Sequence, residues 1–425
     1  MKILKTFLLF SFIFLFLQSI KAQWIEQYSG DTVNFKSVSA VDNNIAWISG
    51  DVQRVYRTTN GGTNWVRRSS NGIPYPLSLS NVFGVDENVA LVAGTFNGDR
   101  TFVFRTSNGG ASWVQVFSQQ NGFINSIWMN NGLEGFMQGD PVDGRWSLWR
   151  TSNGGITWDS TGVYLPSNGD EYGYVNTMYI TSENQNKSIW FGTDNFRVYH
   201  SSNYGSSWNI QATPNCQYIQ ALWFNDISNG MIGGSGIYST SNGGLNWNFT
   251  SNMISTSGIT GEGNKWWNIQ SYGSNIYFSS NNGVNWVTQF QDTSIQFVDI
   301  TIPRAHTKQY NVWAVGNPGK IFKFNSTVGI IQNNIAELEG YYLSQNYPNP
   351  FNPSTSISYR VPKNAFVKIE LSDILGKIVS IILNEFKIAG SYTIDLDGSK
   401  LKSGIYFYKI ESLNFTQVKK MVVIK

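Results

Sequence analysis

Three features of the sequence predict an all-β fold in two parts, a seven-bladed β-propeller closed by its N-terminal strand and a small Ig-like β-sandwich. The first is a motif, [ST]-x-N-x-G-x-x-W, that occurs six times, with its Trp residues separated by 48, 45, 50, 39 and 39 residues. A period of roughly 40 to 50 residues is typical of four-stranded propeller blades. The second is a composition with 13% charged residues, 15% aromatic residues and 41 glycines, which suits an all-β exported protein. The third is a proline-rich opening after residue 343, followed by six short segments with strand-like patterns.

Each copy of the motif has the residues of a tight turn that leads into a strand. The hydroxyl residue and the Asn can hydrogen-bond to nearby backbone groups. Gly adopts a positive φ that costs other residues about 1–2 kcal/mol. We expect the Trp ring to be buried between one repeat and the next. The Asn, Gly and Trp positions are, in order, Asn60, Gly62 and Trp65; Asn108, Gly110 and Trp113; Asn153, Gly155 and Trp158; Asn203, Gly205 and Trp208; Asn242, Gly244 and Trp247; and Asn281, Gly283 and Trp286.

The motif resembles the Asp-box (BNR repeat) of sialidase-like and sortilin-like propellers, with Asn where that family usually has Asp. The longer pattern G-x-[IV]-[YF]-x-[ST]-x-N-G-G-x-x-W is more similar to Ycf48-type propellers, which are named for a photosystem II assembly factor. The resemblance covers roughly residues 23–326. It implies a propeller fold and gives little information about activity.

The N-terminal segment 23–29 resembles the half-repeat that follows each motif, because Trp24 lies 41 residues, about one period, before Trp65. At the other end, residues 312–316 and 320–324 predict two strands that are not followed by a seventh motif. We expect residues 23–29 to supply the missing outer strand of this last blade, which removes the free sheet edges. This pairing gives seven blades; six and eight remain alternatives.

Residues 1–22 have the pattern of a secretory signal peptide. Two Lys precede an apolar run over residues 6–20, and cleavage is expected between Ala22 and Gln23. The run is short for a membrane span, and no later segment is long and apolar enough to be one. The sequence therefore predicts an exported protein without a transmembrane segment.

Residues 343–425 predict a separate β-sandwich after a linker at 330–342, which ends the propeller region 23–329. Three Pro at positions 348, 350 and 353 exclude helix, and strands are expected at 355–359, 365–371, 377–383, 390–395, 404–410 and 418–424. The opening Tyr-Pro-Asn-Pro-Phe-Asn-Pro-Ser and the closing Lys-Lys-Met-Val-Val-Ile-Lys resemble the type A C-terminal sorting domain of the type IX (Por) secretion system. The resemblance implies that the secretion machinery is a partner of this domain. It also implies passage via the periplasm and through the outer membrane, with release or surface attachment. An ordinary Ig-like adhesion or FlgD-like module is the alternative.

Charge and residue types exclude several classes of function. Residues 22–340 hold 16 Lys and Arg against 21 Asp and Glu, a mildly acidic balance that argues against nucleic acid. Cys216 is the only cysteine, so we expect a buried apolar residue and no disulfide within the chain. His200 and His306 are the only histidines, and His200 stands where other repeats have Arg. No metal site or cofactor is predicted.

The loops between the second and third strands of four repeats each carry Asp and Arg. These residues are Asp51 and Arg54; Asp99 and Arg100; Asp140, Asp143 and Arg145; and Asp194 and Arg197. They should lie at the end of the propeller opposite the motif turns. One interpretation is a ring of charge that binds a polar or anionic ligand. The other, which we favour, is a set of surface ion pairs that recur with the repeat.

The sequence therefore favours a noncatalytic secreted or surface propeller that binds a protein or a glycan. Trp146, Trp149, Trp266 and Trp267 lie outside the motifs and are candidates for a sugar-binding platform, although blade cores also need large side chains. The alternative is a polysaccharide-acting glycoside hydrolase with an unrecognised pair of carboxylates, which such enzymes need at a defined separation.

Overall fold

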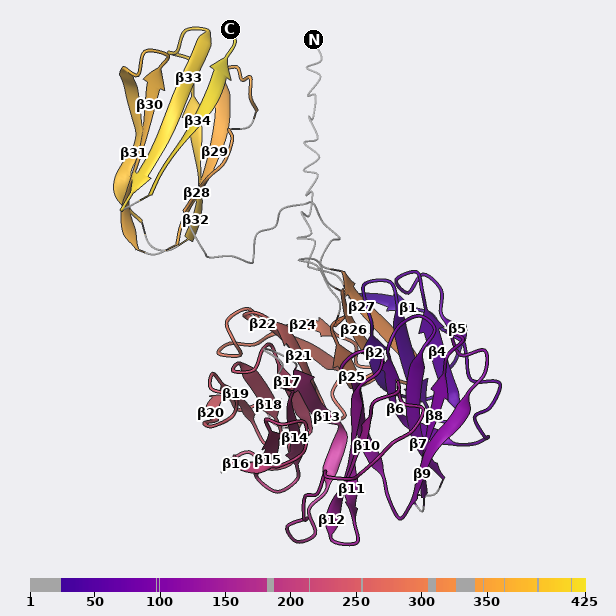
Figure 1. Cartoon of the computed structure of the whole chain (residues 1–425). Coiled ribbons are helices and arrows are strands. Elements are labelled where there is room, and N and C mark those ends of the chain that lie inside the picture. Colours follow the sequence, from indigo (N-terminus) through magenta and orange to yellow (C-terminus); the bar gives the residue numbers. More distant parts are fainter. Residues whose placement is uncertain are drawn as a thin grey trace, which may run out of the picture. The chain divides into compact units, whose positions relative to one another are not determined.

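The structure is a computed structural model that describes residues 24–96, 98, 100–181, 187–213, 215–253, 255–304, 311–325, 341–346, 348–362, 364–387, 390–413 and 415–425. The chain divides into two compact units, one within residues 1–331 and one within residues 332–425 (Figure 1). Every regular element in the described residues is a β-strand, which confirms the predicted all-β class. No helix in this part of the chain has the length and apolar character to span a bilayer. The predicted signal peptide, residues 1–22, and the segment 326–340 of the predicted linker region lie outside the described residues.

The described residues of the first unit form seven antiparallel sheets. The first four comprise β2 (Phe35–Ala40), β3 (Ala46–Gly50), β4 (Arg54–Thr58) and β5 (Val66–Arg67); β6 (Ser78–Gly84), β7 (Ala90–Phe96), β8 (Arg100–Thr106) and β9 (Val114–Gln120); β10 (Ile124–Met129), β11 (Gly135–Val142) and β12 (Arg145–Thr151); and β13 (Gly173–Thr181), β14 (Ser188–Thr193), β15 (Arg197–Ser201) and β16 (Asn209–Ala212). In the third sheet, two isolated bridges, Arg150 with Asp159 and Arg145 with Pro166, stand where the other sheets have a fourth strand.

The remaining three sheets continue the same order. They comprise β17 (Ala221–Phe224), β18 (Gly230–Gly233), β19 (Ile237–Thr240) and β20 (Asn248–Ser251); β21 (Thr256–Glu262), β22 (Lys265–Gln270), β23 (Asn275–Ser279) and β24 (Val287–Gln291); and β25 (Gln296–Thr301), β26 (Asn311–Asn317), β27 (Lys320–Asn325) and β1 (Trp24–Gln27). In the last sheet β1 pairs antiparallel with β27, with Trp24 opposite Phe324.

The first strand of each sheet, here called the inner strand, lies against the inner strands of the neighbouring sheets. The contacts run from β2 through β6, β10, β13, β17, β21 and β25, and β25 in turn contacts β2. Buried aromatic and aliphatic side chains fill the spaces between successive sheets; Trp47, Trp190 and Trp313 are fully buried there. Burial of such side chains contributes roughly 1.5–3 kcal/mol each. The inner strands therefore surround a common axis, and the side chains of these strands line the space around it.

The six motifs form turns of one geometry, here called box turns. In each turn the first hydroxyl donates to the Asn Oδ1 at 3.0–3.1 Å. The same hydroxyl accepts the N–H of the motif Gly at 2.7–2.9 Å. The motif Gly residues have φ between 75° and 89°, and a Cβ on Gly205 would lie 2.7 Å from the Phe136 ring of the preceding sheet. The turn thus needs Gly both for its backbone angle and for close packing between repeats.

The box turns mark one end of each sheet. The N–H of Gly61 donates to the Asn44 carbonyl in the connection between the first and second strands, and Gly109 and Gly243 make the corresponding bonds. Box turns and first connections therefore lie together at one end, here called the box end. The loops between second and third strands lie at the opposite end, here called the loop end, because neighbouring strands are antiparallel.

The second unit contains two sheets around one hydrophobic core. β28 (Tyr342–Leu343), β29 (Ser354–Val361) and β32 (Gly390–Asp397) form one sheet; β31 (Ile378–Lys387), β30 (Ala365–Asp373), β33 (Gly404–Ser412) and β34 (Phe415–Val423) form the other. The core includes Ile357, Val367, Ile369 and Tyr408, all fully buried. All six strands expected from the sequence are present within a few residues of their predicted bounds.

Candidate functional site

A cavity lies among the inner strands of the first unit, and every inner strand contributes to its wall. The narrower part has a volume of about 70 Å³. A second, larger cavity of about 410 Å³, here called the wide part, shares Trp128, Trp223 and Arg304 with the first and is lined by the ends of β10, β13, β17 and β21 and by residues 302–304. Because inner strands lead into the first connections, this wider part lies at the box end.

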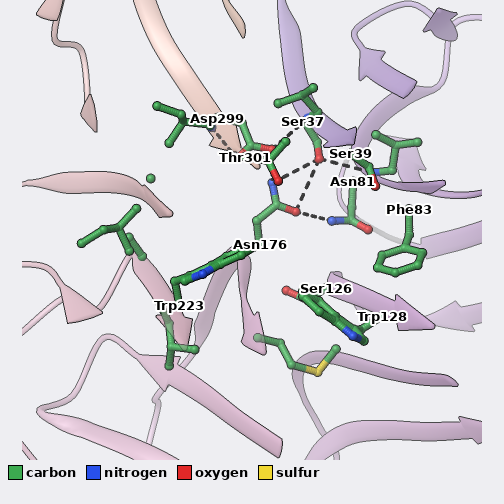
Figure 2. A pocket seen from close by; sticks show the side chains of 18 of the residues that line it. Ser37, Ser39, Asn81, Phe83, Ser126, Trp128, Asn176, Trp223, Asp299 and Thr301 are labelled. Carbon is green, nitrogen blue, oxygen red and sulfur yellow. Dashed lines mark hydrogen bonds between the residues drawn. The ribbon is translucent and has the colours of Figure 1, made fainter. Parts of the chain in front are cut away.

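The narrow part is lined by apolar residues, among them Phe83, Trp128 and Trp223, and by polar side chains of which several hydrogen-bond to one another (Figure 2). Asn176, on β13 with φ of 62°, reaches toward strands that lie far from it in sequence. Its Nδ2 donates to Ser37 Oγ at 3.1 Å and to Asp299 Oδ2 at 2.7 Å, and its Oδ1 accepts from Asn81. Positive φ is tolerated best by Gly, Asn and Asp. One Asn therefore ties β13 to β2, β6 and β25 across the axis.

Asp299 is the acidic residue of this network and is only 7% exposed. Its Oδ2 also accepts the N–H of Val38 at 2.8 Å, and its Oδ1 accepts the N–H of Ile300 at 2.9 Å. Burial raises the pKa of Asp299 to about 7, although these hydrogen bonds oppose the shift. The carboxyl group is therefore close to half-protonated at neutral pH.

The wide part of the cavity has an aromatic wall made by Trp128, Tyr179 and Trp223, which end three successive inner strands. Their ring centroids lie 4.8 Å apart between Trp128 and Tyr179, 5.0 Å between Tyr179 and Trp223, and 6.4 Å between Trp128 and Trp223. All three side chains are half-buried, and Figure 2 shows Trp128 and Trp223 on the side of Asn176 away from Ser37 and Asp299. We call these three residues the aromatic wall.

Arg304 follows β25 and lines both parts of the cavity. Its guanidinium lies 3.9 Å from the centroid of the Phe83 ring, donates to Ser39 Oγ at 3.1 Å and donates to the Gly84 carbonyl. Burial lowers the pKa of Arg304 to about 10, so the side chain stays charged at neutral pH. These three contacts are all with neutral groups.

Two of the predicted loop-end arginines, Arg54 and Arg197, contact acidic residues other than their predicted partners. Arg54 Nε lies 2.6 Å from Asp31 Oδ2, which also accepts from the Tyr56 hydroxyl at 2.7 Å. These hydrogen bonds lower the pKa of Asp31 to about 2 against the effect of burial. Arg197 repeats the arrangement, with its Nη1 3.6 Å from Glu171 Oε2, whose Oε1 accepts from the Tyr199 hydroxyl at 2.6 Å. In both repeats the third strand starts with Arg-Val-Tyr, and its Arg and Tyr side chains contact one carboxylate. That carboxylate lies in the segment before the first strand of the same sheet.

The loop-end aspartates bond mainly to uncharged groups. Asp51 accepts from Ser78 Oγ at 2.6 Å and lies 3.6 Å from Lys36 Nζ. Asp140 accepts from Asn125 Nδ2 at 2.7 Å and from the N–H of Gly173 at 2.9 Å, and burial raises its pKa. Asp194 accepts the N–H of Tyr172 at 3.0 Å. Each of these Asp side chains hydrogen-bonds to a neighbouring segment of the chain, which explains why Asp recurs in these loops.

Four predicted loop-end residues remain. Arg100 donates from Nε to Gln120 Oε1 at 2.9 Å. Arg145 is exposed and forms a backbone bridge with Pro166, while Asp143 lies in the preceding turn with φ of 52°. Asp99 lies outside the described residues. The charged ring as a ligand site stays a prediction.

The other candidate residues named from the sequence are buried or packed against neighbouring side chains. Trp146, Trp266 and Trp267 are 1%, 2% and 1% exposed, so their faces are not available to a sugar. Cys216 is fully buried, and burial raises the pKa of its thiol to about 12. His200 stacks on Trp190 with centroids 4.7 Å apart, as Arg57 covers Trp47 in the corresponding place. The described residues contain no group of three or more His, Cys, Asp or Glu that could hold a metal ion.

The aromatic wall was missed in the sequence, although a signal for it exists. The segments Asn-Ser-Ile-Trp at 125–128, Asn-Thr-Met-Tyr at 176–179 and Gln-Ala-Leu-Trp at 220–223 occupy equivalent positions on their inner strands. Connections of unequal length separate them from the box turns, which hides the alignment when the motif Trp is used as the only reference point.

Solved structures similar to this chain have propeller-type folds. YCF48 from Cyanidioschyzon merolae is 17% identical with a TM-score of 0.54, covering 71% of this chain and 98% of that chain. A structure of YCF48 bound to a D1 peptide is 16% identical with a TM-score of 0.52, covering 71% and 97%. The GH74 enzyme of Niastella koreensis is 13% identical with a TM-score of 0.52, covering 79% and 59%. A search of curated protein sequences gave no match.

At these identities the likeness shows the fold alone, and the neighbours include an enzyme as well as a peptide-bound protein. Residues 345–425 match the model of the secretion system C-terminal sorting domain. A domain of this kind implies export to the cell surface or into the medium. The chain thus joins a propeller-type fold to a C-terminal sorting domain of the type IX secretion system, at residues 345–425.

Proposed function

We propose that this protein is a noncatalytic secreted or surface-attached propeller that binds a protein or glycan partner at the aromatic wall of its axial cavity. The observation that supports this function most strongly is the wall itself. Three half-buried aromatic side chains from successive inner strands line a cavity of about 410 Å³, a size within the usual range for ligand sites.

The proposal includes a ring of seven blades. The seven sheets, the inner-strand contacts from β2 round to β25 and back to β2, and the pairing of β1 with β27 support it. In such a ring the first and last segments of residues 23–329 share one blade, which protects sheet edges. The relative positions of the aromatic side chains are then held by the whole ring.

The proposed route of export has two signals. Residues 1–22 would direct the chain to the periplasm and be removed between Ala22 and Gln23, and residues 343–425 would then engage the type IX machinery. Residues 330–342 would serve as the linker between cargo and tail. Cleavage sites can be checked by N-terminal sequencing of the protein recovered from the medium and from the cell surface.

Glycoside hydrolysis is the second candidate, since the cavity lining includes two acidic residues. Asp299 lines the narrow part and Glu262 lines the wide part, and a pKa near 7 suits a general acid. Asp299, however, already accepts hydrogen bonds from Val38, Ile300 and Asn176. A retaining or inverting enzyme needs two carboxyl groups that face one scissile bond, and these two line different parts of the cavity.

One experiment separates binding from catalysis. The full chain is incubated with a panel of polysaccharides and cell-surface extracts, and both retention and released sugars are measured. We expect retention without release, and Trp223→Ala should abolish it. Released oligosaccharides that disappear in Asp299→Asn and Glu262→Gln would instead establish the hydrolase. In the same assay, stepwise loss of retention in Asp51→Ala, Asp140→Ala and Asp194→Ala would move the site to the loop end.

A further inference from the structure

The rings of the aromatic wall form a continuous surface. Adjacent rings are inclined by 54° to 65°, with centroids 4.8–6.4 Å apart, so they already contact each other edge to face. Little room is left between the rings for a caged cation, which needs ring faces on several sides of it. Because the rings are inclined to one another, a flat, partly apolar ligand face, such as the C–H face of a sugar ring, stacks on one ring and meets the edges of the others.

Arg304 brings a positive charge to a cavity whose lining also includes Asp299 and Glu262, and its described hydrogen bonds and ring contact are all with neutral groups. Its side chain is half-buried, and its described hydrogen-bond partners are Ser39 and the Gly84 carbonyl. A charge removed from water is costly unless a partner of opposite sign is near. Arg is also the side chain best suited to hold a carboxylate through two parallel hydrogen bonds.

Asn225 adds a hydrogen-bond acceptor to the wall of the same cavity. Its Nδ2 donates to the Gly263 carbonyl at 2.6 Å, which fixes the amide. Its Oδ1 is buried and has no hydrogen-bond partner among the described residues. An unpaired buried acceptor costs roughly as much as a lost hydrogen bond, and rotation of the Asn225 side chain toward the cavity would let a ligand hydroxyl satisfy it.

From the wall, the charge and the acceptor together, we infer that the ligand is an acidic glycan built from hexuronic acids. A sugar ring stacks on one ring of the aromatic wall, its carboxylate meets Arg304, and a hydroxyl donates to Asn225 Oδ1 once that side chain has turned toward the cavity. This inference rests on the proposed function, since it names the ligand class of the same site. It needs no covalent step.

The test compares two probes with the same sugar chain, one with charged carboxylates and one with neutral methyl esters in their place. Tetragalacturonate and its methyl ester are titrated into the full chain by calorimetry, with tryptophan fluorescence as a second signal. We expect the acid to bind roughly ten-fold or more tightly than the ester, because a charge-assisted pair is about twice as strong as a neutral one. Higher ionic strength should weaken binding of the acid and leave binding of the ester unchanged.

Variants then test whether Arg304 supplies the positive charge that binds the acid. Arg304→Gln should reduce binding of the acid to the level of the ester and leave the ester as in the wild type. Arg145→Gln, an exposed arginine outside the lining of this cavity, is the matched control and should change neither. Circular dichroism checks that each variant is folded. If Arg304→Gln does not fold, Arg304→Lys should keep a preference for the acid while binding it less tightly.

Each outcome is decisive. Equal binding of acid and ester, or an acid preference that survives in folded Arg304→Gln, would overturn the inference. Binding of neutral glycans alone, or of a purified peptide or protein in place of glycans, with loss in Trp223→Ala, would reject the acidic-glycan assignment and keep the proposed function. Acid binding that Trp223→Ala and Arg304→Gln both leave unchanged would reject both.

Discussion

The two parts of the axial cavity come from the same inner strands but use their side chains differently. In the narrow part, Asn176 and Asp299 bond to side chains and backbone of three other strands. In the wide part, Trp128 and Trp223 contact each other and line open volume. Trp128 and Trp223 line both parts, whereas Ser126, two residues before Trp128 on β10, lines the narrow part alone.

The difference separates stability from recognition. A polar group that is satisfied inside the protein contributes to the folded state and offers little to a ligand. An aromatic face beside a cavity, and an arginine without an acidic partner, are available for recognition. The narrow part should therefore determine stability and the wide part should determine binding, and the following changes test that division.

Asp299→Ala should have the largest effect on stability. It leaves the N–H groups of Val38 and Ile300 and the Asn176 amide without their acceptor in a buried place, at a cost of about 3 kcal/mol. Urea unfolding measures this change. Asp51→Ala, near the surface, is the control and should cost under about 1 kcal/mol. A variant that kept full stability and lost ligand would reverse the assignment of the two parts.

Trp223→Ala should have the largest effect on binding. Loss of one indole from the aromatic wall should weaken ligand binding by roughly ten-fold or more. The free energy of unfolding should fall by about 2 kcal/mol, because the side chain is half-buried. Calorimetry and thermal unfolding give the two numbers. Trp149→Ala removes a half-buried indole from β12 outside this cavity and should leave affinity unchanged. Equal affinity losses in both would show a general effect of unfolding.

The pH dependence of stability should reveal the titration of the Asp299 carboxyl group. Its folded pKa of about 7 lies above the usual value of 3.8 for Asp, so the folded state binds more protons between these values. Its contribution to stability is fully present below about pH 4 and is lost as pH rises toward 7. Urea midpoints across this range should show a smaller decline in Asp299→Asn. An unchanged slope would mean that the buried carboxyl titrates normally.

His200 should give a smaller slope of opposite sign. Burial lowers its pKa from 6.5 to about 4, so the unfolded state binds more protons between these values and stability falls as pH decreases through them. His200→Arg restores the residue type of other repeats and should remove this loss. Its position on β15, stacked on Trp190, lies outside the cavity lining, so ligand affinity at pH 7 should not change. A change in affinity would show that the outer sheet influences the wide part.

The sequence was sufficient to predict what the repeats share. The box turns, their glycines and the strands of residues 342–423 follow from local patterns of Gly, Asn, Pro and alternating apolar residues. The pairing of Trp24 with Phe324 was expected from the length of one period. Local chemistry fixes these features, and the same chemistry recurs in each copy.

The site could not be predicted in the same way because it depends on which repeats become neighbours on the axis. Asn176 is an ordinary Asn in sequence, and only its positive φ and position direct it toward Ser37 and Asp299. Arg54 and Arg197 were expected to pair with nearby Asp residues, whereas they contact Asp31 and Glu171. Short-range pairs are visible in sequence, but partners that depend on loop paths are not.

The most direct test of the central claim is a titration of the full chain with tetragalacturonate, followed by chromatography of the recovered oligomer. The account predicts saturable binding, loss of that binding in Trp223→Ala, full binding in the folded fraction of Asp299→Ala, and recovery of the oligomer intact. Shortened oligomers would show an enzyme. Binding that survives in Trp223→Ala and fails in folded Asp299→Ala would contradict the division between a structural narrow part and a binding wide part.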